Sequence, residues 1–133
     1  MASCTVDLSK SPDFASLCEH WRKHGYLSVH KDVENAVATI AANHEALHCN
    51  RMQRFEDLLD GRLLLKYRFK DSQHREGARG GWRMIAVLDP KTRALFPIMI
   101  YPKKVWDVPN DEDLRQRVAS LAMALRQREL PGT

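Results

Sequence analysis

The chain has 133 residues and a net charge of +4, with 44% hydrophobic and 29% charged residues. This length favours one domain over 1–133, and the composition excludes a disordered or fibrous chain. No apolar run approaches the ~20 residues that a membrane-spanning helix needs. The three cysteines have no framework spacing, which is typical of a reducing compartment. We therefore expect a cytoplasmic protein without membrane contact.

Positive charge is concentrated in the middle of the chain. Between Arg62 and Lys104 there are eleven basic and three acidic residues, a net charge of +8. Residues 1–61 carry −3 and residues 105–133 carry −1. Like charges placed together are unfavourable unless an anion binds them. This middle segment is therefore where we expect an acidic ligand.

The first third of the chain predicts a short strand and two helices. Cys4–Leu8 alternates apolar and polar residues, as a short strand does. Ser11 is the expected N-cap of a first helix, and Gly25 is its expected stop. Apolar residues then repeat at helical spacing from about 31 to 46, so the pattern predicts a helical hairpin over about 11–46.

The middle of the chain predicts a loop followed by three strands. Residues 47–61 have no clear period, which indicates a loop. Arg62–Lys70 alternates between an apolar face and a largely cationic one. Trp82–Leu88 is a nearly continuous apolar run, typical of a central strand, and Ala94–Tyr101 is expected to form a hairpin with it. Pro97 inside the second run indicates an edge position or a bulge.

A last helix is expected over about 111–129, with Asn110 as its N-cap and an acidic first turn. The predicted order is βααβββα. Segregated runs of strands and helices indicate a small α+β domain with an antiparallel sheet packed against helices.

His44 and His48 lie near the predicted end of the second helix, with Cys49 beside the latter. Two histidines four residues apart on a helix can hold zinc, but the sequence shows no third ligand. We therefore interpret the three residues as a polar cluster at the helix end, and we expect neither a metal nor another cofactor.

Basic residues of the predicted sheet are candidates for binding nucleic acid. Lys66, Arg68 and Lys70 lie two residues apart on one strand face, with about 6.5 to 7 Å between neighbours, which matches the phosphate spacing of an extended strand. Backbone N–H groups of a glycine-rich turn can approach a phosphate closely. The other candidates for this cleft are Arg75, Arg79, Gly80, Gly81, Lys104 and, for base stacking, Tyr67, Trp82 and Trp106. The alternative is that these cations only keep a solvated sheet face polar.

Three motifs in this segment resemble the RelE/ParE toxin superfamily, most closely its RelE/HigB-like branch. They are Leu65-Lys66-Tyr67-Arg68, Arg79-Gly80-Gly81-Trp82-Arg83-Met84-Ile85 and Ile100-Tyr101-Pro102-Lys103. That branch has an L-x-K-x-R strand, a K/R-G-G-x-R strand and an I-Y-x-K strand end in the same order. The predicted element order also agrees with the family fold, although the motifs span only Leu64–Lys104.

The resemblance implies the toxin of a type II toxin–antitoxin system. Such a toxin is a metal-independent endoribonuclease that cleaves translated mRNA on the ribosome and is silenced by a cognate antitoxin protein. By motif position, Arg68 and Arg83 are assigned to transition-state charge. Lys66 is assigned to activation of the 2′-hydroxyl, if Arg68 and Lys70 lower its pKa. Tyr101 or Lys103 is then the candidate proton donor.

The chain departs from several relatives that carry a catalytic His or Tyr near the C-terminus. It has no His after His74 and no Tyr after Tyr101. His74 could act as the acid or base if its loop folds over the cleft, although a lone loop histidine is more often solvated. Two other functions stay open: a ParE-like inhibitor of DNA gyrase, which needs no catalytic cations, and an inactive relative that only binds an antitoxin-like protein.

Overall fold

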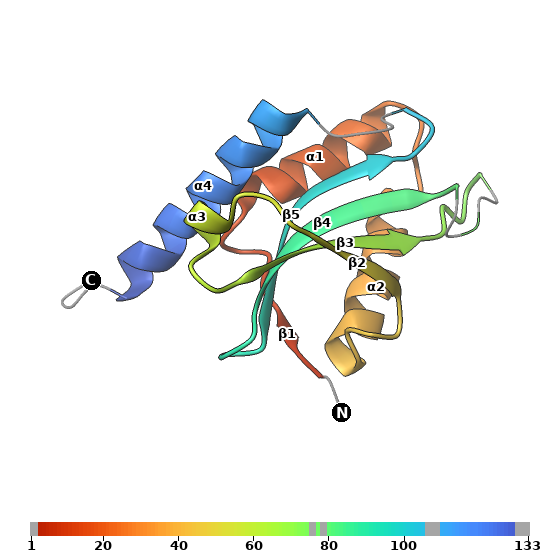
Figure 1. The fold of residues 1–133 in the computed structure, drawn as a ribbon. Coiled ribbons are helices and arrows are strands. Elements are labelled where there is room, and N and C mark those ends of the chain that lie inside the picture. The colour runs from red at the N-terminus through yellow and green to blue at the C-terminus, as the bar shows by residue number, and fades with distance from the viewer. Residues whose placement is uncertain (1–2, 75–76, 78–79, 106–109, 130–133) are drawn as a thin grey trace.

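A five-stranded sheet in the order β1-β5-β4-β3-β2 forms the centre of the molecule (Figure 1). The computed structural model describes residues 3–74, 77, 80–105 and 110–129. The pairing of β1 with β5 is parallel, and the other pairs are antiparallel. The strands are β1 Thr5–Val6, β2 His48–Met52, β3 Leu63–Phe69, β4 Trp82–Asp89 and β5 Ala94–Pro102.

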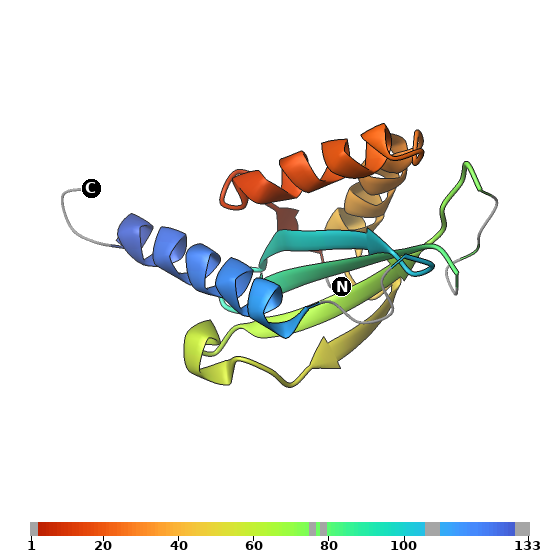
Figure 2. The same cartoon turned by 90° about the horizontal axis from the view of Figure 1, so that it is seen from above.

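Helices cover both faces of the sheet. Helices α1 (Pro12–Lys23) and α2 (Val29–Ala42) lie on one side, while α4 (Asp111–Glu129) lies on the other, beside the short α3 (Glu56–Leu59) (Figure 2). The structure confirms the predicted α+β class. One sheet pair is parallel, because β1 lies beside β5 and runs in the same direction, with Thr5 opposite Ala94.

The predicted loop at 47–61 is wrong, since both β2 and α3 lie within it. β2 pairs with β3 from His48 opposite Arg68 to Met52 opposite Leu64. It is an edge strand whose residues are exposed or half-buried, so backbone hydrogen bonds rather than a buried apolar face fix it. The element order therefore becomes βααβαβββα. Helix α2 also ends at Ala42, before the predicted boundary near 46.

The predicted helix boundaries are partly confirmed by their caps. Gly25 has a φ of +97° after α1, and the Tyr26 N–H donates to the Trp21 carbonyl at 3.0 Å, as in a Schellman motif. Ser11 occupies the N-cap position, but its hydroxyl makes no capping hydrogen bond. At α4 the Asn110 side chain accepts a bond from the Asp113 N–H at 3.1 Å, as predicted.

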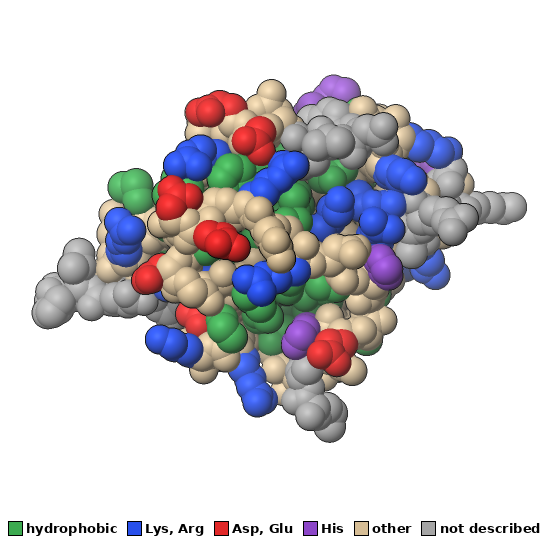
Figure 3. Space-filling model, viewed as in Figure 1, with side chains coloured by type: hydrophobic (Ala, Val, Ile, Leu, Met, Phe, Trp, Pro, Cys, Tyr) green, Lys and Arg blue, Asp and Glu red, His purple; other side chains and the backbone are tan. Residues whose placement is uncertain are grey.

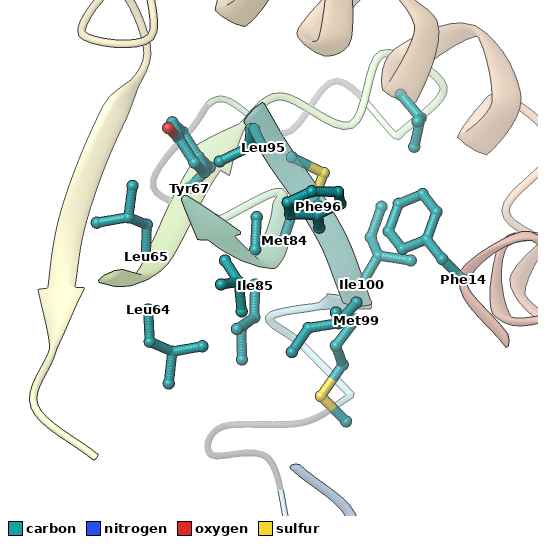
Figure 4. Close-up of a cluster of buried hydrophobic side chains, with 14 of the residues drawn as sticks. Phe14, Leu64, Leu65, Tyr67, Met84, Ile85, Leu95, Phe96, Met99 and Ile100 are labelled. Carbon is teal, nitrogen blue, oxygen red and sulfur yellow. The ribbon is translucent and has the colours of Figure 1, made fainter. Parts of the chain in front are cut away.

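The core lies on both faces of β4, which is the central strand, as predicted. Apolar side chains from β3, β4, β5 and α1 meet there (Figure 4). The register of β4 with β5 shifts between Ile85 and Ala86, which pair with Met99 and Pro97. The intervening Ile98 is the extra residue of a bulge, so the bulge predicted at Pro97 is confirmed. Two indole N–H groups tie the helices to the sheet: Trp21 donates to the Ile100 carbonyl at 2.8 Å, and Trp82 to Asp32 at 3.0 Å.

Candidate functional site

The strand register places four of the predicted catalytic residues on one face of the sheet. Arg68 on β3 pairs with Arg83 on β4, and Arg83 pairs with Tyr101 on β5. Paired residues point to the same side, and Lys66 shares that side with Arg68 because strand side chains alternate. Lys66, Arg68, Arg83 and Tyr101 therefore form one group, which we call the cationic face.

The cationic face lies at the end of the sheet that α4 leaves open. Val87, four residues after Arg83 on the same strand face, lines a small space with Val118 and Leu121 of α4. The helix thus covers the Val87 end of this side of the sheet. Figure 3 shows Lys and Arg side chains gathered beyond it, over the ends of β3 and β5 and the start of β4.

The members of the cationic face influence one another's protonation. Burial lowers the pKa of Lys66 below its ordinary value, and the charges of Arg68, Arg83 and Arg54 lower it further. The pKa of Lys66 is thus shifted in the direction that its assigned role requires, but burial is the main cause, and Arg83 and Arg54 act where Lys70 was expected. Burial and Arg68 likewise lower the pKa of Arg83.

Three of the basic residues at this end of the sheet have no acidic partner within the part of the chain that the structure describes. Among the described residues, no carboxylate forms an ion pair with Lys66, Arg68 or Lys70. The Nε atom of Arg68 is buried and has no hydrogen-bond partner in the described part of the chain. Arg83 is only 5% exposed, and one of its guanidinium nitrogens donates to the Trp82 carbonyl at 3.2 Å. Arg83 is thus held beneath Lys66 and Arg68, which carry the positive charge to the surface.

The predicted proton donors differ in access. Tyr101 is buried, at 1% exposure, beside Arg83. Lys103 is exposed in the turn that follows β5, where its N–H donates to the Gly81 carbonyl at 3.0 Å, and Lys104 is exposed next to it. The Lys103 side chain is therefore accessible to a ligand, whereas the Tyr101 hydroxyl is not accessible without a rearrangement.

The glycines of the turn before β4 have a structural role. A Cβ atom on Gly81 would lie 2.5 Å from the Phe69 carbonyl oxygen and 2.8 Å from the Asp71 nitrogen. Only glycine permits this close approach of the two chain segments. The Gly80 N–H already donates to the Gly77 carbonyl at 3.1 Å, so it is not directed at a ligand. The predicted phosphate contacts Arg75 and Arg79, and Trp106 as a stacking residue, lie outside the described residues.

His74 contacts the connection between α1 and α2 and not the cationic face. Its Nδ1 lies 2.7 Å from a carboxylate oxygen of Asp71, and its ring lies 5.0 Å from that of Tyr26. Asp71 is buried and also accepts a hydrogen bond from Ser28, at the start of α2. This histidine therefore helps to anchor the β3–β4 connection to α2.

The sequence pattern missed His48 and Arg54, which flank the cationic face. His48 is exposed on β2 directly opposite Arg68, so the interpretation of a helix-end cluster is wrong. His48, Arg68 and Lys70 also line a cleft of about 460 Å³ between α2 and the ends of β2 and β3. Polar α2 residues, Asn35 and Thr39 among them, line its other wall. The alternation in 62–70 identifies Arg68 and Lys70, but nothing in 47–61 indicates the partner strand that brings His48 beside them.

Comparisons with family models, curated proteins and solved structures found no match to this chain. In the described ranges, no helix combines the length and apolar character needed to cross a membrane. Within the same residues there is also no group of three or more His, Cys, Asp or Glu side chains that could hold a metal ion. The functional argument therefore rests on the geometry of the cationic face.

Proposed function

We propose that the protein is the RelE-like toxin of a type II toxin–antitoxin system, acting in the cytoplasm as an endoribonuclease on ribosome-bound mRNA. The observation that carries this proposal is a pair of strand cations, Lys66 and Arg68, which have no acidic partner among the described residues and lie beside the buried Arg83. Such a set favours a polyanion, because each cation can take one phosphate or share one.

The spacing of the cations favours an extended nucleic acid strand. Residues two apart on one strand, such as Lys66 and Arg68, are about 6.5 to 7 Å apart, and neighbouring strands are about 4.8 Å apart. The cationic face thus offers positive charge in two directions over a distance of one or two nucleotides. Arg68, with its planar fork of donors, suits a phosphate better than a compact ammonium does.

In the proposed reaction, RNA supplies the nucleophile and these side chains supply the base and the charge stabilisation. The 2′-hydroxyl oxygen attacks the adjacent phosphorus, the bond to the 5′-oxygen breaks, and a 2′,3′-cyclic phosphate and a 5′-hydroxyl form. Lys66 removes the 2′-hydroxyl proton, a role that its lowered pKa supports because it increases the neutral amine fraction. Arg68 and Arg83 stabilise the extra negative charge on the phosphorane oxygens.

The same charges provide a means of silencing. A cognate antitoxin with an acidic segment would compete with RNA for the cationic face, since Lys66, Arg68 and Lys70 have no intramolecular carboxylate in the described residues to compete with it. The proposed partners are therefore mRNA with the ribosome in the active form and the antitoxin protein in the silent form.

The test is cleavage of mRNA on translating ribosomes by the purified protein, with the product ends identified. We expect 2′,3′-cyclic phosphate and 5′-hydroxyl ends, and no cut where the scissile nucleotide is 2′-deoxy. The Lys66→Ala protein should be strongly impaired, whereas Arg115→Ala, which changes a cation on α4, should cut normally. Intact mRNA together with blocked supercoiling by DNA gyrase would replace this proposal with the ParE-like function. Intact mRNA and unaffected gyrase would leave a binding protein without catalysis.

A further inference from the structure

The proposed reaction requires a proton donor that the four grouped residues do not provide. The leaving 5′-oxygen must be protonated as its bond to phosphorus breaks. Arginine side chains donate hydrogen bonds but stay protonated in proteins, so they do not transfer a proton to the leaving oxygen. Lys66 is already used as the base, and Tyr101 is 1% exposed. A donor must therefore come from another residue that reaches the same phosphate.

His48 occupies the position that such a donor needs. It lies on β2 directly opposite Arg68, so the row across the sheet runs His48, Arg68, Arg83 and Tyr101. Residues that face each other in an antiparallel pair have Cα atoms about 5 Å apart. A phosphate held by the Arg68 guanidinium is therefore within reach of the neighbouring imidazole. His48 is exposed, in contrast to Tyr101.

A cleft of about 460 Å³ lies beside His48 at the edge of the sheet; His48 and Arg68 line it, and Asn35 and Thr39 of α2 bound its other side. A pocket of this size falls in the range that holds a small organic ligand. Because α2 covers the side of the sheet opposite the cationic face, a leaving nucleotide would pass round the edge strand β2 to enter the cleft.

The charged groups near His48 come from two elements. On β3, Arg68 is opposite, and Lys66 and Lys70 are the diagonal neighbours on the same face. On α2, Asp32 lines the same cleft, where its carboxylate accepts bonds from Ser72 and Trp82. A protonated imidazole ring is the side chain that enzymes most often use as a general acid.

We propose that His48 is the general acid of the reaction: it donates a ring N–H proton to the leaving 5′-oxygen while Lys66 accepts the proton of the 2′-hydroxyl. This assignment rests on the proposed ribonuclease function. It places the acid of this chain on the edge strand β2. In several members of the resembled family, a catalytic His or Tyr lies near the C-terminus instead.

The test uses two versions of one RNA, presented in the ribosomal A site. One has the ordinary 5′-oxygen at the scissile phosphate and the other a bridging 5′-sulfur, whose thiolate leaves without protonation. We expect His48→Ala to cut the oxygen RNA about 100-fold more slowly than wild type or worse, and the sulfur RNA within a few-fold of wild type. His44→Ala, which changes a histidine outside the strand, should match wild type on both.

The outcomes separate this inference from the proposed function. If wild type cuts neither RNA, the ribonuclease function and the acid both fall. If wild type cuts and His48→Ala stays within twofold of it on the oxygen RNA, only the inference falls. Equal slowing on both RNAs would also overturn it, because a structural or binding role predicts no rescue by sulfur. Thermal unfolding of His48→Ala, an exposed position, checks that the fold is retained.

Discussion

The cations beside α4 and those of the cationic face are in opposite electrostatic situations. Around α3 and α4 three arginines meet carboxylates: the pairs are Arg54–Asp111 at 3.0 Å, Arg115–Asp57 at 3.1 Å and Arg117–Asp113 at 3.2 Å. At the open end of the sheet, Lys66, Arg68 and Lys70 have no such partner among the described residues. The difference indicates that Arg54, Arg115 and Arg117 are used within the fold, while Lys66, Arg68 and Lys70 are available to a ligand.

Neither the ion pairs near α4 nor the repulsion within the cationic face changes the stability of the protein by much. An exposed ion pair contributes about 0 to 1 kcal/mol to stability. Two like charges 5 Å apart in a watery environment repel by about 1 kcal/mol. The cationic face thus lowers the stability of the unliganded protein modestly, and a bound polyanion reverses the effect.

The largest expected effect is the loss of cleavage when Arg68 is removed. Arg68→Ala should cut ribosome-bound mRNA about 100- to 1000-fold more slowly, because a preorganised donor to the phosphorane oxygens is lost. Arg117→Ala, which removes another half-buried arginine that is paired with Asp113, should cut at the wild-type rate. Single-turnover cleavage rates are measured for both variants. Equal rates for Arg68→Ala and wild type would contradict the catalytic role of Arg68.

Gly81→Ala should reduce stability by about 2 kcal/mol or more, since the added methyl overlaps backbone atoms that cannot move aside. Gly77→Ala is the matched control, because a Cβ there meets nothing within 4 Å. Urea unfolding compares the two. A destabilised Gly81→Ala protein beside an unaffected Gly77→Ala protein assigns the turn to the fold rather than to phosphate binding. Similar stability of both variants would contradict this.

A smaller effect on stability distinguishes Arg62, which pairs with Asp89, from Arg68, which has no carboxylate partner in the described ranges. Arg62 lies 3.4 Å from Asp89, and both side chains are largely buried, so Arg62→Met should lower the free energy of unfolding by about 1 to 2 kcal/mol. Arg68→Met should leave that free energy unchanged or raise it slightly, because it removes repulsion from Lys66 and Arg83. A loss in Arg68→Met as large as in Arg62→Met would show that Arg68 supports the fold.

The smallest effect is a pH dependence of stability that comes from Lys66. Its pKa is lowered in the folded protein, so between that pKa and the ordinary value of 10.5 the unfolded chain binds a proton that the folded chain has released. Stability contributed by Lys66 therefore rises with pH in this window. The free energy of unfolding of wild type minus that of Lys66→Met should increase from pH 8 to 10.5. A constant difference would mean that the folded environment does not disfavour the charge.

The parts of the fold with a clear local signal could be predicted. The alternation in β3, the apolar run of β4, the bulge at Pro97 and the N-cap Asn110 are all properties of short sequences. β2 could not be predicted, because its five residues carry no buried alternating face and its partner lies beyond a further helix.

The candidate site shows the same limit. Lys66 and Arg68 share a face through the two-residue period of one strand, which the sequence displays. Their proximity to Arg83, Tyr101 and His48 depends on the register of three strand pairs, which no single segment encodes. His74 was a candidate through its position in a loop, and it is held instead by Asp71 and Tyr26, neither of which belongs to a recognisable motif.

The most direct test of the central claim is protein synthesis in a cell extract that receives wild type, the Arg68→Ala/Lys70→Ala double variant or Arg115→Ala, with mRNA integrity followed in the same samples. Wild type and Arg115→Ala should stop synthesis and leave mRNA cut within coding sequence, whereas the double variant should allow synthesis with intact mRNA. Equal inhibition by all three proteins, or inhibition by none, would contradict the assignment of the cationic face to RNA cleavage.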